Sequence, residues 1–284
     1  MAGFNSYKAV VDSFDNGATH FTSWRKLPSQ TTSQGSWFDL SVAPGSPTPQ
    51  YYAAAPMESV AMYRSVQGGL YHGHDLPGAT KSLLRLGGTT TAVAPFNMVL
   101  CDYLMFYPFI DQSITDPQTF DNIATLPRYT DGKGVKVMAI AVGAQAGLQY
   151  FNLTYTNSEG VSGRTTPNVR MFTQGVTGTL VTAAPTTQDT CGPFIPLQAG
   201  DTGVRSIEAV TMIGGDVGLF TLVLVKPLAQ LNILENATFT EIDFVKDFPV
   251  LPTIYANAYL NFICQTMGNI SGAQINGYLE VNWS

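Results

Sequence analysis

The segment His72-Gly-His74-Asp75 has the clearest capacity for metal chemistry in this chain. Two histidines two positions apart on a strand point to one face, and a neighbouring carboxylate adds an oxygen ligand. The chain has three histidines in all, so a further nitrogen ligand would have to be His20. Gly73 and the Leu-Pro-Gly that follows indicate instead a loop with exposed polar side chains. We therefore expect no bound metal and no cofactor.

Residues suited to catalysis are also present, but their spacing does not indicate any particular reaction. Glycoside hydrolysis needs two carboxylates held a few ångströms apart. The segment 102–121 offers four candidates, which would serve equally well in turns and helix caps: Asp102, Asp111, Asp116 and Asp121. The sequence contains no GxSxG nucleophile elbow, no GxGxxG and no complete phosphate-binding loop. We expect a protein that is not an enzyme, with a glycosidase as an alternative.

Arg205 and Glu208 stand in the otherwise apolar run 204–213. Three positions apart on a strand, their side chains face opposite sides, so we do not expect them to pair with each other. Each would meet a partner on a neighbouring strand or on another subunit. The alternative is that they lie on the exposed face of an edge strand.

Charged residues make up 12% of the chain, about half the roughly 25% that is usual in soluble domains. Protein interfaces are depleted in charge and enriched in aromatic residues, and the chain contains 16 Phe, 13 Tyr and 3 Trp. We therefore expect part of its surface to be covered by other chains. A formal net charge of −6 argues against a nucleic-acid binder.

The cysteines Cys101, Cys191 and Cys264 lie far apart, which fits neither a disulfide framework nor a zinc-binding pattern. We expect them to be reduced, buried thiols. The first residues lack the apolar stretch of a secretory signal. The longest apolar runs are shorter than the ~20 residues that a membrane helix needs. We expect a protein that neither crosses nor enters a membrane.

The N-terminal part is predicted to be a helix followed by an extended arm. Tyr7, Val10, Val11 and Phe14 have helical spacing, Asn5 or Ser6 can cap the helix, and a glycine follows at position 17. From residue 27 to residue 50 the chain is rich in Ser, Thr, Gly and Pro, which favours an extended connector. We assign residues 1–50 to this helix and arm, which would leave the body; a loop within a single domain is the alternative.

Residues 51–284 are predicted to form a β-rich body. Apolar, β-branched and aromatic runs alternate with turn signals at 98–109, 135–142, 149–156, 204–213, 219–226, 254–265 and 275–283. Many short strands without long intervening helices predict an antiparallel β-sandwich or barrel of jelly-roll type. The runs 204–213 and 219–226, joined through Gly-Gly-Asp-Val-Gly, are predicted to pair as a hairpin. A second short helix is expected near 239–248, where Thr238 and Glu241 have capping-box spacing.

Four segments of the sequence resemble virion structural proteins of tailed bacteriophages. They are the opening MAGFNSYKAVVDSF, the segments CDYLMFYPFI (101–110) and TLPRYTDG (125–132), and GPFIPLQAGDTGVRS (192–206). The resemblance runs over most of the chain, to the closing YLEVNW, and its motifs are structural. The long spine helix of the common major capsid fold is missing. The resemblance therefore implies an accessory head protein of the decoration or cement type.

This resemblance also implies partners and a location. The partners would be the major capsid protein and other copies of the chain, as a homo-oligomer such as a trimer, with no specific nucleic acid. The protein would be made in the bacterial cytoplasm and reside in the head of the virion. The alternatives are a tail or fibre module that binds host glycans, a virion enzyme, and the shell subunit itself.

The predicted docking residues are mainly aromatic side chains of the arm. Aromatic residues in a polar, Pro-rich arm have little local core to enter, so docking on another chain is a reasonable use for them. Folding back onto the chain's own body is the alternative. The candidate interaction residues are Phe4, Phe21, Trp24, Trp37, Phe38, Arg205 and Glu208.

Overall fold

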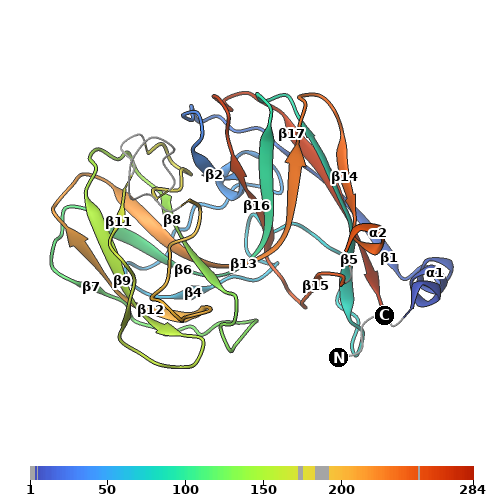
Figure 1. Ribbon diagram of the computed structural model, residues 1–284, viewed down its shortest axis with the longest axis horizontal. Coiled ribbons are helices and arrows are strands. Elements are labelled where there is room, and N and C mark those ends of the chain that lie inside the picture. Colours follow the sequence, from blue (N-terminus) through green and yellow to red (C-terminus); the bar gives the residue numbers. More distant parts are fainter. Residues whose placement is uncertain (1–3, 5, 172–174, 183–191, 249) are drawn as a thin grey trace.

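The computed structural model describes residues 4, 6–171, 175–182, 192–248 and 250–284 (Figure 1). Within them the chain forms three sheets, which we call sheets I, II and III, and every pairing between named strands is antiparallel. Sheet II lies between the other two, with sheet III at one end of the molecule and sheet I at the other. The predicted mainly β, antiparallel, sandwich-like fold is confirmed.

Each sheet is built from strands that lie far apart in the sequence. Sheet I has the order β14 (Thr240–Asp243), β5 (Lys81–Thr90), β17 (Ile275–Trp283), β1 (Thr19–Lys26) and β3 (Gly45–Ser46), with β15 (Thr253–Ile254) also on β5. Sheet II has the order β2 (Trp37–Asp39), β16 (Leu260–Gln265), β6 (Phe96–Asp111), β13 (Leu219–Ile233) and β8 (Lys136–Ala141), with β4 (Val60–Ala61) on β6. Sheet III has the order β10 (Arg164–Thr165), β9 (Tyr150–Asn157), β12 (Val204–Ile213) and β7 (Gln118–Thr119), with β11 (Val169–Arg170) on β9.

The long strands β6 and β13 belong to both halves of the molecule. One apolar cluster fills the space between sheets I and II, and a second fills the space between sheets II and III. Register shifts interrupt the β6–β13 pairing at three places, one of them beside Pro227. Proline has no N–H to donate to the ladder, so it fits within a long strand at such an irregularity. The same two strands therefore supply one wall of each core.

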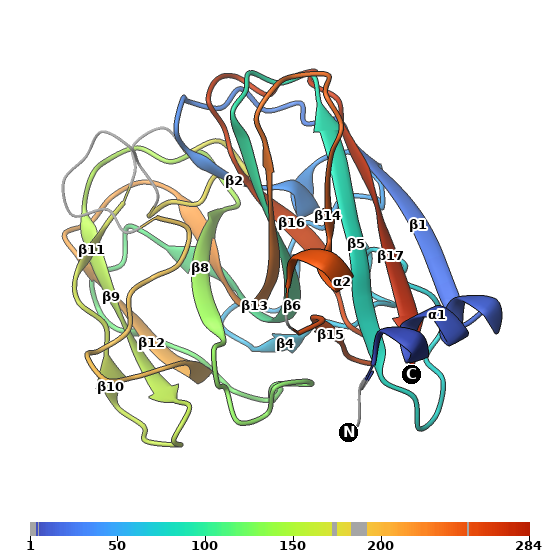
Figure 2. The same cartoon turned by 45° about the vertical axis from the view of Figure 1, so that its right-hand side comes forward.

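The N-terminal helix is confirmed as α1 (Tyr7–Asp15). The Ser6 hydroxyl caps it by accepting a hydrogen bond from the Ala9 amide at 3.2 Å. Gly17 follows with a φ of 69°, a conformation that glycine adopts without a Cβ penalty. Figure 2 shows α1 at the ends of β1, β17 and β5, standing out from the sheets.

The expected arm does not leave the body. Residues of β1 pair along their whole length with β17, from Thr19 opposite Asn282 to Lys26 opposite Ile275, and β3 adds to the other edge. The reason is the alternation within β1, which buries Trp24 and Lys26 and leaves Phe21, Ser23 and Arg25 exposed. A strand with one apolar face gains more by closing a sheet than by extending into water.

The predicted hairpin is wrong, although both of its strands exist. β12 pairs with β9 and β7 in sheet III, whereas β13 pairs with β6 and β8 in sheet II. The connection through residues 214–218 therefore passes from one layer to the next. Apolar residues on both faces of these strands, such as Leu222 and Val223, allow them to pack in the interior of a layered fold.

The second short helix is confirmed as α2 (Phe244–Asp247), and a 3-10 turn, η1, spans Leu40–Val42. The cap of α2 differs from the prediction: Asp243, the last residue of β14, accepts from the amides of Val245 and Lys246. No helix in the described ranges is long and apolar enough to span a bilayer.

Candidate interaction surfaces

The His72 segment forms a closed polar cluster in the structure. The His72 ring is fully buried, with Nε2 at 3.0 Å from the Ala258 carbonyl and Nδ1 at 3.0 Å from Lys81 Nζ. The carbonyl requires a proton on Nε2, so Nδ1 accepts from the ammonium of Lys81. Lys81 also donates to Asp75 at 2.8 Å, and the Arg64 guanidinium lies 3.6 Å from the same carboxylate.

This arrangement places an ammonium where a bound cation would have to sit. Burial, followed by the charge of Lys81, lowers the pKa of His72 to about 3. His20 is packed edge-on against Tyr71, with ring centroids 5.2 Å apart, while His74 accepts from or donates to the Tyr71 hydroxyl at 3.2 Å. Across the described ranges, no group of three or more His, Cys, Asp and Glu residues is arranged to hold a metal ion.

The four acidic residues of the segment 102–121 lie in different environments. Asp102 is buried in an ion pair with Arg128, at 2.7 Å between Oδ1 and Nη2. Asp111 accepts from the amide and hydroxyl of Ser113 at 2.8 and 2.7 Å, which stabilises a turn. Asp116 and Asp121 are exposed. Asp102 and Asp111 thus have structural contacts within the chain.

A second buried carboxylate, Asp39, was not found from the sequence. It accepts from the Tyr103 hydroxyl at 2.7 Å, the Tyr52 hydroxyl at 2.6 Å, and both the amide and hydroxyl of Ser41. Burial raises the pKa of Asp39. It also lowers the pKa of nearby Lys26 to about 8, and the Lys26 ammonium donates to two backbone carbonyls. Tyr103 lies 64 residues from Asp39 and Tyr52 lies 13 residues away, so no local pattern marks this cluster.

Arg205 and Glu208 both find partners inside the chain. Arg205 donates to the Ser158 carbonyl at 2.8 and 3.2 Å. Glu208 accepts from the Thr156 hydroxyl at 2.8 Å and from the Gly163 amide at 3.1 Å. As expected, the structure shows no bond between Arg205 and Glu208 within this described strand. Neighbouring segments of sheet III satisfy them without a second subunit.

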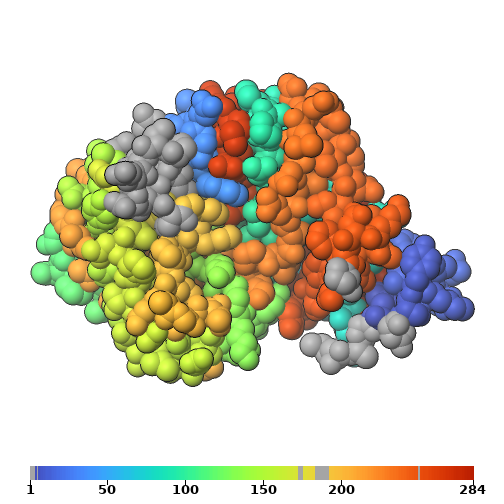
Figure 3. All heavy atoms as spheres, viewed as in Figure 1, coloured from blue at the N-terminus to red at the C-terminus, as the bar shows by residue number. Residues whose placement is uncertain are grey.

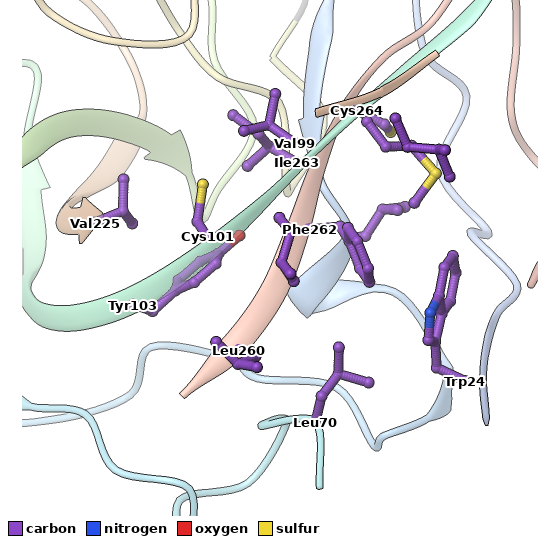
Figure 4. Packing of buried hydrophobic residues seen from close by; sticks show 14 of the residues in the cluster. Trp24, Leu70, Val99, Cys101, Tyr103, Val225, Leu260, Phe262, Ile263 and Cys264 are labelled. Carbon is purple, nitrogen blue, oxygen red and sulfur yellow. The ribbon is translucent and has the colours of Figure 1, made fainter. Parts of the chain in front are cut away.

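The aromatic docking candidates divide into buried and accessible residues. Trp24 is 3% exposed and Phe38 is fully buried, so the prediction that these two dock on a partner is corrected. The Trp24 ring packs against Phe262 with centroids 4.6 Å apart (Figure 4). Both side chains belong to the core between sheets I and II, Trp24 from β1 and Phe38 from β2. Trp37 is half-buried, and Phe21 is 59% exposed.

The first accessible surface is formed by α1 and the segment that contains α2 and β15. We call it the α1 groove. It has a volume of about 670 Å³ and is lined by apolar residues that include Phe4, Tyr7, Val10, Phe244, Phe248 and Val250. A second hollow of about 290 Å³ shares Tyr7, Val10 and Val245 with it and extends to Val11 and Phe14. In Figure 3, α1 forms a ridge beside this segment.

The second accessible surface is the outer face of sheet I. Phe21 of β1 and Phe239, which precedes β14, lie on either side of Tyr278 of β17. Ring centroids are 4.9 Å apart for Phe21 and Tyr278 and 5.7 Å apart for Phe239 and Tyr278. We call these three residues the aromatic face. The candidate residue Phe21 was predicted from the sequence, whereas Tyr278 and Phe239 were not.

The structure therefore defines a layered antiparallel β protein in which the buried charged residues described above are hydrogen-bonded or ion-paired within the chain. No family model matches the sequence, and no curated protein matches it. Among solved structures, the VP2 subviral particle of infectious bursal disease virus is weakly similar, with a TM-score of 0.18, 9% identity, and coverage of 94% of this chain and 80% of that chain.

A second solved structure, of the Gt strain of infectious bursal disease virus, has a TM-score of 0.17 and 10% identity, and covers 94% of this chain and 81% of that chain. Both structures come from a virus other than a tailed bacteriophage.

Proposed function

We propose that the protein is a non-enzymatic structural component of a virion that associates with other protein chains through the α1 groove. The more specific form of the proposal is a decoration protein of a tailed-bacteriophage head, bound to the major capsid protein and to other copies of itself. The observation that carries the proposal is the accessible apolar surface of α1 together with the groove beside it.

The exposed fractions of the side chains describe this surface. On α1, Tyr7 is 72% exposed, Val11 40% and Phe14 38%. Across the groove, Phe248 is 49% exposed and Val250 76%. Contiguous apolar patches of this kind on a protein surface mark places where other molecules bind. The lining of the larger hollow contains no Lys, Arg, Asp or Glu among its described residues, as in the core of a protein interface.

The distribution of charge supports the same proposal. Few residues are charged, and five of them are buried in the interior: Lys26, Asp39, Lys81, Asp102 and Arg128. The outside therefore carries even less charge than the composition indicates. A protein that stays a monomer at high concentration normally relies on surface charge. A protein with little surface charge can instead bury part of its surface against neighbouring chains.

Binding to an assembled shell would stabilise it by mass action. A protein that binds the shell and not the free subunits shifts the equilibrium towards the shell. A standard interface buries about 1,600 Å², and symmetry repeats each contact over the particle. Such a role needs no catalytic residue.

The test replaces the exposed side chains of α1 and leaves its buried residue Val10 in place. In the triple variant Tyr7→Ser, Val11→Ser, Phe14→Ser, we expect self-association measured by sedimentation to weaken at least tenfold. The matched control replaces exposed apolar residues that do not line the groove: Ile123→Ser, Val217→Ser and Leu234→Ser. We expect the control variant to associate like the unaltered protein.

Incorporation into particles provides the second measurement. The triple variant should be depleted from purified virions, and the control should not. Electron microscopy of particles that carry the tagged protein distinguishes a position on the head from one on the tail. A monomeric unaltered protein that does not copurify with particles would contradict the proposal.

A further inference from the structure

The aromatic face combines rings and charged groups on one flat surface. On the outer side of sheet I, Tyr278 lies opposite Gly87 of β5, and Gly87 lies opposite Glu241 of β14. In the next row along the strands, Phe21 lies opposite Glu280, followed by Arg85 and Asp243. Rings and ionised side chains thus occupy adjacent rows of the same four strands.

Gly87 has no side chain, so the rings of Phe239 and Tyr278 can approach the backbone of β5. A Cβ at this position would lie 2.5 Å from Cζ of Phe239 and 3.0 Å from a ring carbon of Tyr278. The two rings therefore come directly over the backbone of β5, where they stack with their planes 7° from parallel. Phe239 remains 50% exposed and Phe21 59% exposed, so ring surface is accessible at both ends of the stack.

The charged side chains beside the rings contact one another and the Tyr278 hydroxyl. Arg85 Nη1 lies 3.4 Å from Glu280 Oε2, and Arg85 Nε lies 3.6 Å from Asp243 Oδ2. The Tyr278 hydroxyl donates to Glu241. These contacts hold planar donors and acceptors within the face, and the Arg85 side chain is 43% exposed.

This mixture of groups favours one class of ligand. An apolar protein surface placed over the face would bury the exposed Glu241 and the Arg85 guanidinium, which is 43% exposed, and burying ionised groups without matching partners is costly. A sugar ring presents C–H groups on its faces and hydroxyls on its rim. The C–H groups can lie against the aromatic rings, while the hydroxyls bond to the carboxylates and the guanidinium in contact with water.

We propose that the aromatic face is a carbohydrate-binding site for an uncharged glycan. The three carboxylates of these rows are balanced by Arg85, by Arg25 one row further along β1, and by Lys246, whose ammonium lies 3.6 Å from Asp243. The face therefore carries no net charge that would attract an acidic polysaccharide. The inference goes beyond the proposed structural function. Arg85 and Asp243 also line the smaller hollow beside α1, whereas the three rings lie outside both hollows.

The experiment measures binding of defined oligosaccharides by titration calorimetry. The probes are cellohexaose, maltohexaose and the hexamer of N-acetylglucosamine, with polygalacturonate as the acidic comparison. We expect at least one uncharged hexamer to bind more tightly than polygalacturonate. Phe21→Ala and Phe239→Ala should each weaken that binding roughly fivefold to tenfold, the loss of one ring contact. Glu241→Gln should also weaken it.

The matched control is Tyr51→Ala, which removes a ring that is 63% exposed elsewhere on the surface, and we expect no effect on binding. Failure of all three uncharged hexamers to bind at millimolar concentration overturns the inference. Equal binding by Phe21→Ala, Phe239→Ala and the unaltered protein does so as well. If these two variants instead weaken self-association in sedimentation, the face is a protein contact and the glycan assignment is wrong.

Discussion

Arg128 binds Asp102 in the interior through two parallel hydrogen bonds, Nε to Oδ2 at 2.8 Å and Nη2 to Oδ1 at 2.7 Å. The guanidinium also donates to the carbonyls of Met62 and Tyr103, and Asp102 accepts from the Tyr259 amide. One ion pair thereby joins β6 to the loop 125–132, to the segment after β4 and to the start of β16.

Replacing Arg128 should strongly destabilise the fold. In Arg128→Met the Asp102 carboxylate loses its guanidinium while buried, which typically costs about 3–5 kcal/mol. We expect this loss in the free energy of unfolding measured with urea. The control is Lys8→Ala, which breaks the exposed Lys8–Asp12 pair and should cost less than about 0.5 kcal/mol. A loss below about 1 kcal/mol for Arg128→Met would show that the pair is not structurally important.

Stability should fall as the pH drops below about 6.5. The folded state holds His72 neutral with a pKa of about 3, whereas the unfolded chain binds the proton near the ordinary value of 6.5. Between these values the unfolded state holds more protons, so acid favours unfolding, by up to about 1.4 kcal/mol per pH unit for this group. His72→Gln should flatten the dependence of unfolding free energy on pH in this window. The exposed His74→Gln variant is the control, and an unchanged slope in His72→Gln would contradict the assignment.

Neighbouring aromatic residues of β1 should differ sharply in their contribution to stability. Trp24→Ala leaves a cavity between sheets I and II and should cost about 3–5 kcal/mol. Phe21→Ala removes an exposed ring three residues away and should cost less than about 1 kcal/mol. Thermal unfolding of the two variants compares them directly. Similar losses in both would mean that β1 is not seated as the structure shows.

Cys101 and Cys264 should resist alkylation in the native protein. Burial raises the pKa of both thiols well above the ordinary value, and neither forms a disulfide. The reactive thiolate is therefore scarce and inaccessible. Mass spectrometry of peptides after iodoacetamide treatment should find both unmodified in the native state and labelled in urea. Rapid native labelling of either would contradict their buried positions.

The amino-acid sequence by itself determined the class of fold and its local elements. Apolar, β-branched and aromatic runs between turn signals predicted strands, the spacing of Tyr7, Val10, Val11 and Phe14 predicted α1, and the short helix near 239–248 was found at 244–247. The buried state of Cys101 and Cys264 also followed from their type; Cys191 lies outside the described residues. These features depend on neighbours within one or two turns of chain, so local sequence is enough to specify them.

Only the tertiary structure decided which strands and charges meet. β13 is buried on both faces from position 220 to 225, so its sequence does not tell which strands it pairs with, and the hairpin expected with β12 became a crossing between layers. The same holds for Asp102 with Arg128 and for Phe21 with Tyr278, whose partners lie 26 and 257 residues away. Such pairs are selected by the packing of the whole chain, because burying an ionised group is tolerable only where the fold supplies its counter-ion.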